Sequence, residues 1–247
     1  MEITDVQNYS DVTCKEPNLM EISQQLLLAV KMKDPATSFI DILKNISPVE
    51  LKKQLVTEND KKAFWINIYN AVIQTTLAKD PEKYNNRALF FGSKLIIIAG
   101  KPLSLDDIEH GILRHSKLKW SGGYLNKLFP SSFEKMNRVK QVDYRIHFSL
   151  NCGATSCPPI AFYKPEQLDQ QLELATEIYL KGECDYNEKS NEVWVPALMN
   201  WFRGDFKGTQ GIKTLLRNLS IIPPDTNPVV RFKRYNWNLF LDNYKNE

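Results

Sequence analysis

One stretch of the chain constrains the fold more than any other: residues 62–79 are apolar on nearly every side and end at Asp80-Pro81. A helix that is hydrophobic all round lies in the middle of a protein rather than on its surface. A chain of 247 residues buries roughly 70–75% of its surface on folding, so it has room to enclose such a helix. The sequence therefore predicts a buried central helix.

The other periodic segments are shorter and of mixed type. Helical spacing and capping residues predict helices over 18–33, from 47 onward, and over 104–114, 165–181 and 210–219. Strand patterns predict a hairpin over 94–103, a half-buried strand over 144–150 and a second hairpin over 186–195. Since no repeat or long linker divides the chain, we expect a single α+β domain. It should have a mostly helical first half, a small antiparallel sheet and an N-terminal helical segment over residues 1–50.

Composition argues against two kinds of partner. Lysine and arginine number 32 against 29 aspartate and glutamate, and this net charge of +3 is spread along the chain. The basic stripe of a nucleic-acid-binding protein is therefore missing. The longest apolar runs are a handful of residues, whereas a membrane-spanning helix needs roughly 18 or more. We expect neither a nucleic acid nor a membrane partner.

The chain start and the cysteines suggest a compartment. Residues 1–5 are acidic and no apolar signal-peptide region follows them, so the expected location is the cytoplasm. The four cysteines, Cys14, Cys152, Cys157 and Cys184, are too few for a disulfide scaffold in a chain that builds its own core. We expect them to be free thiols.

Three amide side chains share one face of the predicted central helix. Asn67, Asn70 and Gln74 follow helical spacing among aromatic and aliphatic neighbours, so they must find hydrogen-bond partners inside the protein. The simpler interpretation is that they tie adjacent loops to the helix through backbone hydrogen bonds. The alternative is that one of them orients a substrate or a catalytic imidazole.

Cys152 is the strongest candidate for chemistry. It lies in a run of small residues and prolines, 151–159, directly after the predicted strand over 144–150. In such a turn a cysteine is exposed to substrate, Gly153 is free to take a positive φ, and backbone N–H groups point at a developing oxyanion. The structural alternative is an inert buried thiol, since free cysteine is among the most buried residue types.

A thiolate near neutral pH needs a base or a positive charge beside it, and the chain has three histidines, His110, His115 and His147. Glu109 and His110 are neighbours on a predicted helix, so they point about 100° apart and Glu109 would not orient His110 directly. His147 precedes Cys152 by five residues, which places the two side chains on opposite faces of a regular strand unless the turn reverses this.

Two further uses of the cysteines remain open. A metal site would combine Cys152, Cys157, Cys184 and a histidine, although this spacing matches no tight structural zinc motif. A redox pair would use Cys152 and Cys157 as attacking and resolving thiols, although Cys-x-x-Cys is absent. The sequence motifs for nucleotide and dinucleotide binding, zinc proteases and α/β-hydrolases are all missing. We therefore expect no cofactor and no metal.

Three blocks of sequence resemble a known family. They read AFWINIYNA at 63–71, IEHGILR at 108–114 and RIHFSLNCGATSCPP at 145–159. In order and spacing they resemble the family called domain of unknown function 547, and residues 201–206 and 235–239 are similar to its closing blocks. The resemblance implies one such domain over residues 51–240.

The family name records no common activity, so the resemblance implies little about function. Plant relatives carry a leucine-zipper segment that this chain lacks, which implies the stand-alone bacterial type. In those relatives the positions of Cys152 and Glu109 keep their residues, whereas the position of Cys157 is often Ser and that of His110 changes. The arrangement is also similar to papain-like and transglutaminase-like folds, whose central helix starts with a cysteine. Because residues 62–65 contain none, the resemblance implies a nucleophile relocated to Cys152 or an inactive, peptide-binding descendant.

The first hypothesis is a thiol-dependent hydrolase or acyltransferase that acts on an amide or acyl substrate. Cys152 is its nucleophile, His110 or His147 assists the thiol, and Glu109 has an orienting role. Its substrate is a peptide or a small molecule. The predicted substrate-binding residues are Asn67, Asn70, Trp65 and Tyr69.

The second hypothesis is a non-enzymatic domain that binds a peptide or a protein. In this case Trp65, Tyr69 and Trp120 line a groove for the partner, and the polar residues named above only hold loops together.

Overall fold

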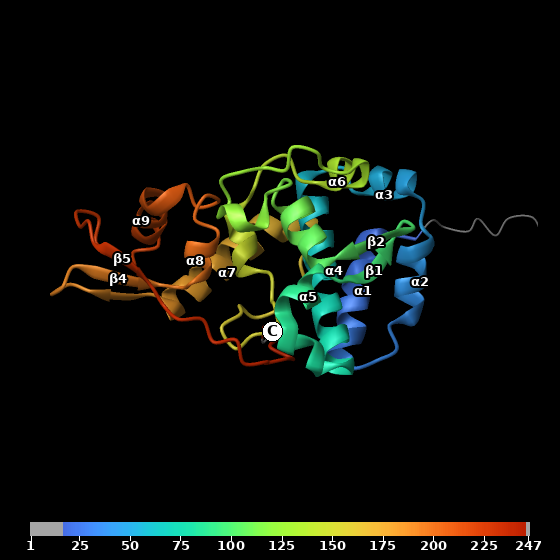
Figure 1. Ribbon diagram of the computed structural model, residues 1–247, viewed down its shortest axis with the longest axis horizontal. Helices are drawn as coiled ribbons and strands as arrows, with labels where there is room; N and C mark the ends of the chain where they lie inside the picture. Colours follow the sequence, from blue (N-terminus) through green and yellow to red (C-terminus); the bar gives the residue numbers. More distant parts are fainter. Residues whose placement is uncertain (1–16, 246–247) are drawn as a thin grey trace, which may run out of the picture.

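Helix α4 (Glu58–Lys79) is enclosed by other elements of the computed structural model, which describes residues 17–245 (Figure 1). It begins four residues before the apolar segment because Thr57 and Asp60 form a capping box. The Thr57 hydroxyl accepts the Asp60 N–H at 3.0 Å, and the Asp60 carboxylate accepts the Thr57 N–H at 2.7 Å. From Lys62 to Gln74 every side chain of the helix is buried, so the predicted central helix is confirmed.

Most of the elements in the described part of the chain are helices. The α-helices are α1 (Leu19–Met32), α2 (Thr37–Asn45), α3 (Pro48–Gln54), α4, α5 (Arg87–Gly92), α6 (Ser132–Asn137), α7 (Leu168–Glu183), α8 (Leu198–Trp201) and α9 (Gly208–Asn218). Short 3₁₀ turns are η1 (Pro81–Asn86), η3 (Lys119–Ser121), η4 (Tyr144–Phe148) and η5 (Pro165–Gln167), and η2 (Asp107–Leu113) is a π-helix. The predicted helices over 18–33, from 47, over 165–181 and over 210–219 are confirmed, with small shifts at their ends.

Two small sheets lie at opposite ends of the molecule (Figure 1). Strands β1 (Lys94–Ile98) and β2 (Lys101–Ser104) form the predicted antiparallel hairpin. Strands β3 (Asp185–Asn187) and β4 (Glu192–Val195) form the second predicted hairpin. The returning chain adds β5 (Val229–Phe232) parallel to β4, which makes this sheet mixed. With helices and sheets segregated in this way, the predicted single α+β domain is confirmed.

Two clusters of buried apolar side chains form the core. The larger surrounds α4, and the smaller lies among the end of α7, the second sheet, α8 and α9. They meet at η4, where Ile146 belongs to the larger cluster and Phe148 to the smaller one. Within residues 17–245 no helix combines the length and the apolar character needed to span a bilayer.

The predicted strand over 144–150 is wrong, because residues 144–148 form the 3₁₀ helix η4. The Asp143 carboxylate accepts the N–H of Arg145 at 3.2 Å and so starts a helical turn. No strand among the described residues lies beside this segment to pair with it. Because the segment is helical, Ile146, His147 and Phe148 are all buried, and the expected separation into two faces does not occur.

The predicted helix over 104–114 exists, but most of it is the π-helix η2. The N–H of Arg114 bonds to the carbonyl of Glu109 at 2.8 Å, and the N–H of Ser116 bonds to the carbonyl of Gly111 at 2.8 Å, each five residues back. A π-helix turns less per residue than an α-helix, so adjacent side chains on it diverge less than the expected 100°. This places Glu109 and His110 closer together than the sequence suggested.

Candidate functional site

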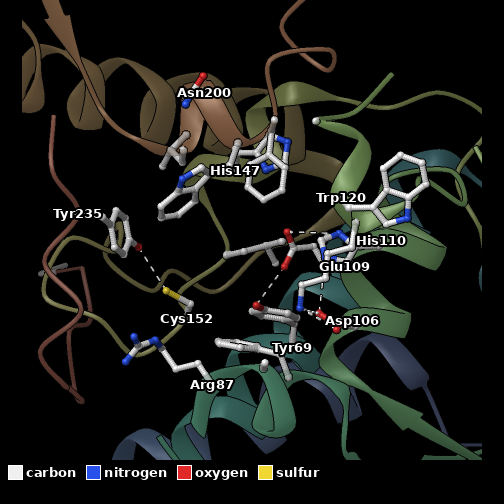
Figure 2. Close-up of a pocket in the computed structure, with 18 of the residues that line it drawn as sticks. Tyr69, Arg87, Asp106, Glu109, His110, Trp120, His147, Cys152, Asn200 and Tyr235 are labelled. Atoms are coloured by element: carbon white, nitrogen blue, oxygen red, sulfur yellow. Dashed lines mark hydrogen bonds and ion pairs between the residues drawn. The ribbon is translucent and has the colours of Figure 1, made fainter. Parts of the chain in front are cut away.

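A pocket of about 630 Å³ opens between α4, α5, η2, η4, α8 and the C-terminal segment. Its volume lies within the roughly 300–1,000 Å³ of small-molecule sites. Five of the predicted site residues line it: Tyr69, Glu109, His110, His147 and Cys152. Figure 2 shows Tyr69, Glu109 and His110 gathered on one side and Cys152 beside Tyr235 on the other. The structure thus brings together side chains that are far apart in the sequence, from Tyr69 in α4 to Tyr235 in the C-terminal segment.

Trp65, Asn67 and Asn70 do not line the pocket. Trp65 is fully buried and packs edge-on against Phe64 and Phe133. The Asn67 amide donates to the carbonyl of Tyr163 at 2.9 Å and accepts its N–H at 3.0 Å. Asn67 therefore ties a neighbouring loop to α4 through backbone hydrogen bonds, as the simpler interpretation of the three amides expects.

Asn70 holds the chain just before Cys152. Its amide donates to the carbonyl of Ser149 at 3.0 Å, and its oxygen accepts the N–H of Asn151 at 2.9 Å. Farther along α4, the oxygen of Gln74 accepts the N–H of Asp242 at 2.9 Å. Two of the three amides therefore secure the turn and the C-terminal segment that covers it.

The turn that carries Cys152 is fixed from both sides. The Asn151 side chain donates to the carbonyl of Pro158 at 2.9 Å and accepts the N–H of Gly153 at 2.9 Å. On the other side the C-terminal segment donates from the N–H of Phe240 to the carbonyl of Gly153 at 2.8 Å. Gly153 has φ +85°, so the prediction of a positive φ is confirmed.

Cys152 and Cys157 face each other across this turn with their sulfur atoms 2.7 Å apart. Both are free thiols, and the Tyr235 hydroxyl lies 3.2 Å from each sulfur. Cys152 is partly exposed and lines the pocket, whereas Cys157 is 5% exposed and lies behind it. The two thiols and the phenol form one cluster, and Cys152 is its contact with the pocket.

Backbone N–H groups of the turn point at Cys157. The Cys157 sulfur accepts the N–H of Cys152 at 3.0 Å and that of Ala154 at 3.4 Å. The N–H of Gly153 is already bound to Asn151. The expectation that these groups stabilise an oxyanion beside Cys152 is therefore wrong, because the turn aims them at the second sulfur instead.

These contacts divide the proton between the two thiols unequally. Burial would raise the pKa of Cys157, but the hydrogen bonds from Cys152, Tyr235 and the two backbone N–H groups outweigh it and lower that pKa. The same hydrogen bond to Cys157, together with burial, raises the pKa of Cys152 well above its ordinary value. Negative charge therefore belongs on Cys157 and the shared proton on Cys152.

No hydrogen bond joins Cys152 to a histidine among the described residues. The His147 Nε2 atom lies 2.8 Å from the Asp205 carboxylate, and the ring stacks on Phe202 at 4.0 Å between centroids. Burial lowers the pKa of His147, and the hydrogen bond to Asp205 opposes this. His147 faces the pocket as a buried imidazole with a carboxylate partner.

Glu109 is the most chemically unusual group on the opposite side. Its side chain is 13% exposed, and it accepts a hydrogen bond from the Tyr69 hydroxyl at 3.2 Å. Burial raises its pKa from 4.5 to about 7, although the charge of Arg114 works in the other direction. A carboxyl group of this kind is partly protonated near neutral pH and can both give and take a proton.

His110 sits between Glu109 and Arg114. Its Nδ1 atom lies 2.8 Å from the guanidinium of Arg114 and 3.7 Å from the Glu109 carboxylate. Burial, and next the charge of Arg114, lower the pKa of His110 well below its ordinary value. His110 is therefore neutral, and it connects the carboxyl group to the buried guanidinium.

The remaining histidine and cysteine lie away from the pocket. His115 is 2.7 Å from the carbonyl of Val139. Cys184 packs against the smaller core cluster, where burial raises its pKa to about 12. Cys14 lies outside the described residues. Among residues 17–245 no group of three or more His, Cys, Asp or Glu side chains is arranged to hold a metal ion.

Several pocket residues were not predicted from the sequence. Arg87, from α5, lies over the ring of Trp237 at 4.8 Å. Trp201 and Trp237 stack 5.4 Å apart, and Trp237 is 4.6 Å from the Tyr235 ring. The aromatic residues of the closing sequence blocks were the signal for this wall, because such residues often line binding sites.

A family model described as "Protein of unknown function, DUF547" matches residues 53–180. The chain belongs to this family. The match includes α4, η2 and the turn with both cysteines, so the DUF547 resemblance of the three sequence blocks is confirmed. Asp205 and Tyr235 follow the matched DUF547 residues along the chain. A search of the curated proteins gave no match, and a search of the solved structures gave none either.

Proposed function

We propose that the pocket is the active site of a thiol-dependent hydrolase or acyltransferase in which Cys152 attacks an amide or acyl substrate. One observation carries the proposal: the partly exposed Cys152 faces the same pocket as Glu109, whose pKa is about 7. A nucleophile and a proton carrier on opposite walls of one small-molecule-sized pocket are what acyl transfer requires. Free thiols support a reducing compartment such as the cytoplasm as the location of this activity.

In the first step Cys152 passes its proton to Cys157, which lies 2.7 Å away and accepts it as the local base. The Cys152 sulfur then adds to the substrate carbonyl carbon, and its electron pair forms the new carbon–sulfur bond. The guanidinium of Arg87, which lines the same pocket, neutralises the charge that develops on the carbonyl oxygen.

In the second step the tetrahedral intermediate collapses and the leaving amine or alcohol takes the proton of Glu109. The Glu109 carboxylate then removes a proton from water, or from an acceptor, which attacks the thioester and releases Cys152. His110 lies 3.7 Å from this carboxylate and extends the path for the proton. His147 forms the wall beside them, held by Asp205.

The test is acyl-enzyme formation with an activated ester. The protein is mixed with p-nitrophenyl acetate, nitrophenol release is recorded, and peptide mass spectrometry locates the acetyl group. We expect acetylation at Cys152, no burst in Cys152→Ser, and an unchanged burst in the control Cys184→Ser. In Glu109→Gln the acetyl group should form but leave at least about tenfold more slowly. Acetylation of Cys184 as fast as Cys152 would overturn the proposal.

A binding function is the second candidate, and the aromatic wall of the pocket favours it. Trp120, Trp201, Phe202, Tyr235 and Trp237 all line the pocket, and such surfaces bind peptides or flat ligands without chemistry. If Cys152 does not acylate, a peptide library screened by fluorescence of these tryptophans decides whether this second function holds.

A further inference from the structure

The cluster of Cys152, Cys157 and Tyr235 contains more than an acyl transfer site needs. Acyl transfer needs a base beside the nucleophilic thiol, but that base need not be a sulfur at 2.7 Å, and backbone N–H groups directed at that sulfur make it a weaker base. These N–H groups and the Tyr235 hydroxyl stabilise a thiolate on Cys157, the buried member of the pair. Lowered thiol pKa values beside hydrogen-bond donors and paired cysteines are features of thiol–disulfide chemistry.

We propose that Cys152 and Cys157 act as a dithiol that reduces a low-molecular-weight disulfide bound in the pocket, with a Cys152–Cys157 disulfide as the protein product. This activity goes beyond acyl transfer and does not rest on it. It needs both sulfur atoms, whereas the acyl transfer proposal makes only Cys152 the nucleophile.

The exposure of the two sulfurs sets the order of the steps. Cys152 lines the pocket, so it meets the disulfide RS–SR first, after passing its proton to Cys157. Its thiolate attacks one sulfur and the RS–SR bond breaks. One RS⁻ is released, and the other RS group stays bonded to Cys152 as a mixed disulfide. RS⁻ takes the proton from Cys157 and departs as RSH.

The second step closes the internal disulfide. The Cys157 thiolate attacks the sulfur of Cys152, the mixed disulfide bond breaks, and the second thiol leaves as RS⁻, which takes a proton from water near neutral pH. Two thiols of the protein have then given two electrons to one disulfide. The thiol pair supplies the one proton that it shared and water supplies the other, so both thiols leave as RSH. The dithiol is the reductant, and the small disulfide is the oxidant.

The pocket indicates the chemical class of this disulfide. Among residues 17–245, Arg87 contacts the rings of Tyr84 and Trp237 and forms no ion pair. Figure 2 shows its guanidinium on the same side of the pocket as Cys152. A guanidinium beside an aromatic wall suits a carboxylate on a peptide-like ligand. We therefore expect a carboxylate-bearing peptide disulfide, and glutathione disulfide serves as the probe.

The experiment treats the fully reduced protein with glutathione disulfide and follows the products by non-reducing peptide mass spectrometry. We expect the wild type to form a Cys152–Cys157 cross-linked peptide and to release two equivalents of glutathione. Cys157→Ser should stop at a mixed disulfide on Cys152 and release one equivalent. Cys152→Ser should react at least about tenfold more slowly, and the control Cys184→Ser should behave like the wild type.

Two results would overturn the inference. One is a stable mixed disulfide on Cys152 in the wild type with no internal cross-link. The other is a cross-link that forms only after the protein is unfolded in denaturant. Both of these results are measured on the wild-type protein, so they can be interpreted even if Cys157→Ser does not fold. The esterase burst of the reduced wild type is scored separately, so failure of one activity is distinguishable from failure of the other.

A substitution of Arg87 tests the substrate class. Arg87→Gln should slow the reaction with glutathione disulfide at least about fivefold more than it slows the reaction with uncharged hydroxyethyl disulfide. Equal slowing with both disulfides would contradict a carboxylate contact at this residue.

Discussion

Arg114 and Asp205 form an ion pair in which neither side chain is exposed, with Nε 2.6 Å from Oδ2. The pair joins the end of η2 to the segment that follows α8, and the same Asp205 oxygen contacts His147 at 2.8 Å. The guanidinium also lies 4.4 Å from the ring centre of Phe202. One carboxylate therefore connects two pocket walls that belong to different core clusters.

Asp205→Asn should destabilise the protein by about 3–5 kcal/mol, since it leaves the Arg114 charge buried without a counter-charge. The substitution keeps the size of the side chain, so loss of packing contributes little. Urea unfolding measures the change. The matched control is Asp185→Asn, because Asp185 pairs with Lys233 while 73% exposed, and it should cost at most about 1 kcal/mol. Equal costs for the two variants would refute this assignment.

Glu109 should make stability depend on pH in a definite direction. Its folded pKa, about 7, lies above its ordinary 4.5, so the folded protein holds the proton more tightly than the unfolded chain. The stability this contributes is complete below about pH 4.5 and is lost as pH rises through 7, a change of about 3 kcal/mol.

The comparison with Glu109→Gln isolates this effect. The variant stays neutral at every pH, so its unfolding free energy should not show the loss between pH 4.5 and 7. Glu166→Gln, at an exposed position, should keep the wild-type slope. Parallel curves for the wild type and Glu109→Gln would show that Glu109 does not have the raised pKa.

Gly153 should tolerate substitution poorly. It has φ +85°, and an added Cβ would lie 3.0 Å from a methyl carbon of Leu77. Gly153→Ala should therefore cost about 1–3 kcal/mol in thermal or urea unfolding. Gly182→Ala is the control, because its Cβ meets no atom within 4 Å in helix α7, and it should stabilise by up to about 1 kcal/mol. The prediction fails if both substitutions change stability in the same direction.

Substitutions of Asn70 and Asn67 should have similar effects on stability but different effects on the reactivity of Cys152. Each is fully buried and makes two hydrogen bonds to backbone groups, so alanine at either position should cost about 2–4 kcal/mol. Only Asn70 holds the residue before Cys152. Alkylation of Cys152 in the folded protein should therefore change several-fold in Asn70→Ala and stay near the wild-type rate in Asn67→Ala. Equal alkylation rates in the two variants would contradict a role for Asn70 in positioning the turn.

Local patterns were sufficient where burial alone decides the structure. Residues 62–79 are apolar on all sides, and only a central helix buries them all. The pattern over 144–150 misled because alternation over a few residues does not exclude a helical turn, and the absence of a neighbouring strand is not visible locally. The π-helix at Glu109 depends on hydrogen bonds from an N–H to the carbonyl five residues earlier, and hydrophobic periodicity in the sequence does not reveal this pattern.

The site could be predicted only in part, because its decisive contacts are long-range. Cys152, Glu109 and the histidines were found from residue type and turn chemistry. Tyr235 reaches the thiols from 83 residues away, and Asp205 reaches Arg114 from 91 residues away. The spacing of residues along the chain does not predict such long-range pairs. The nearest partner of Cys152 therefore proved to be Cys157, not an imidazole.

The most direct test of the central claim is the rate at which each thiol of the folded protein is alkylated by iodoacetamide between pH 5 and 9, read by peptide mass spectrometry. We expect Cys152 to react at least about tenfold faster than Cys184 at pH 7, because Cys152 faces the pocket and Cys157 accepts its proton, and we expect Cys157→Ser to slow it. If Cys152 is as slow as Cys184 and reacts only on unfolding, the pocket is not a thiol active site.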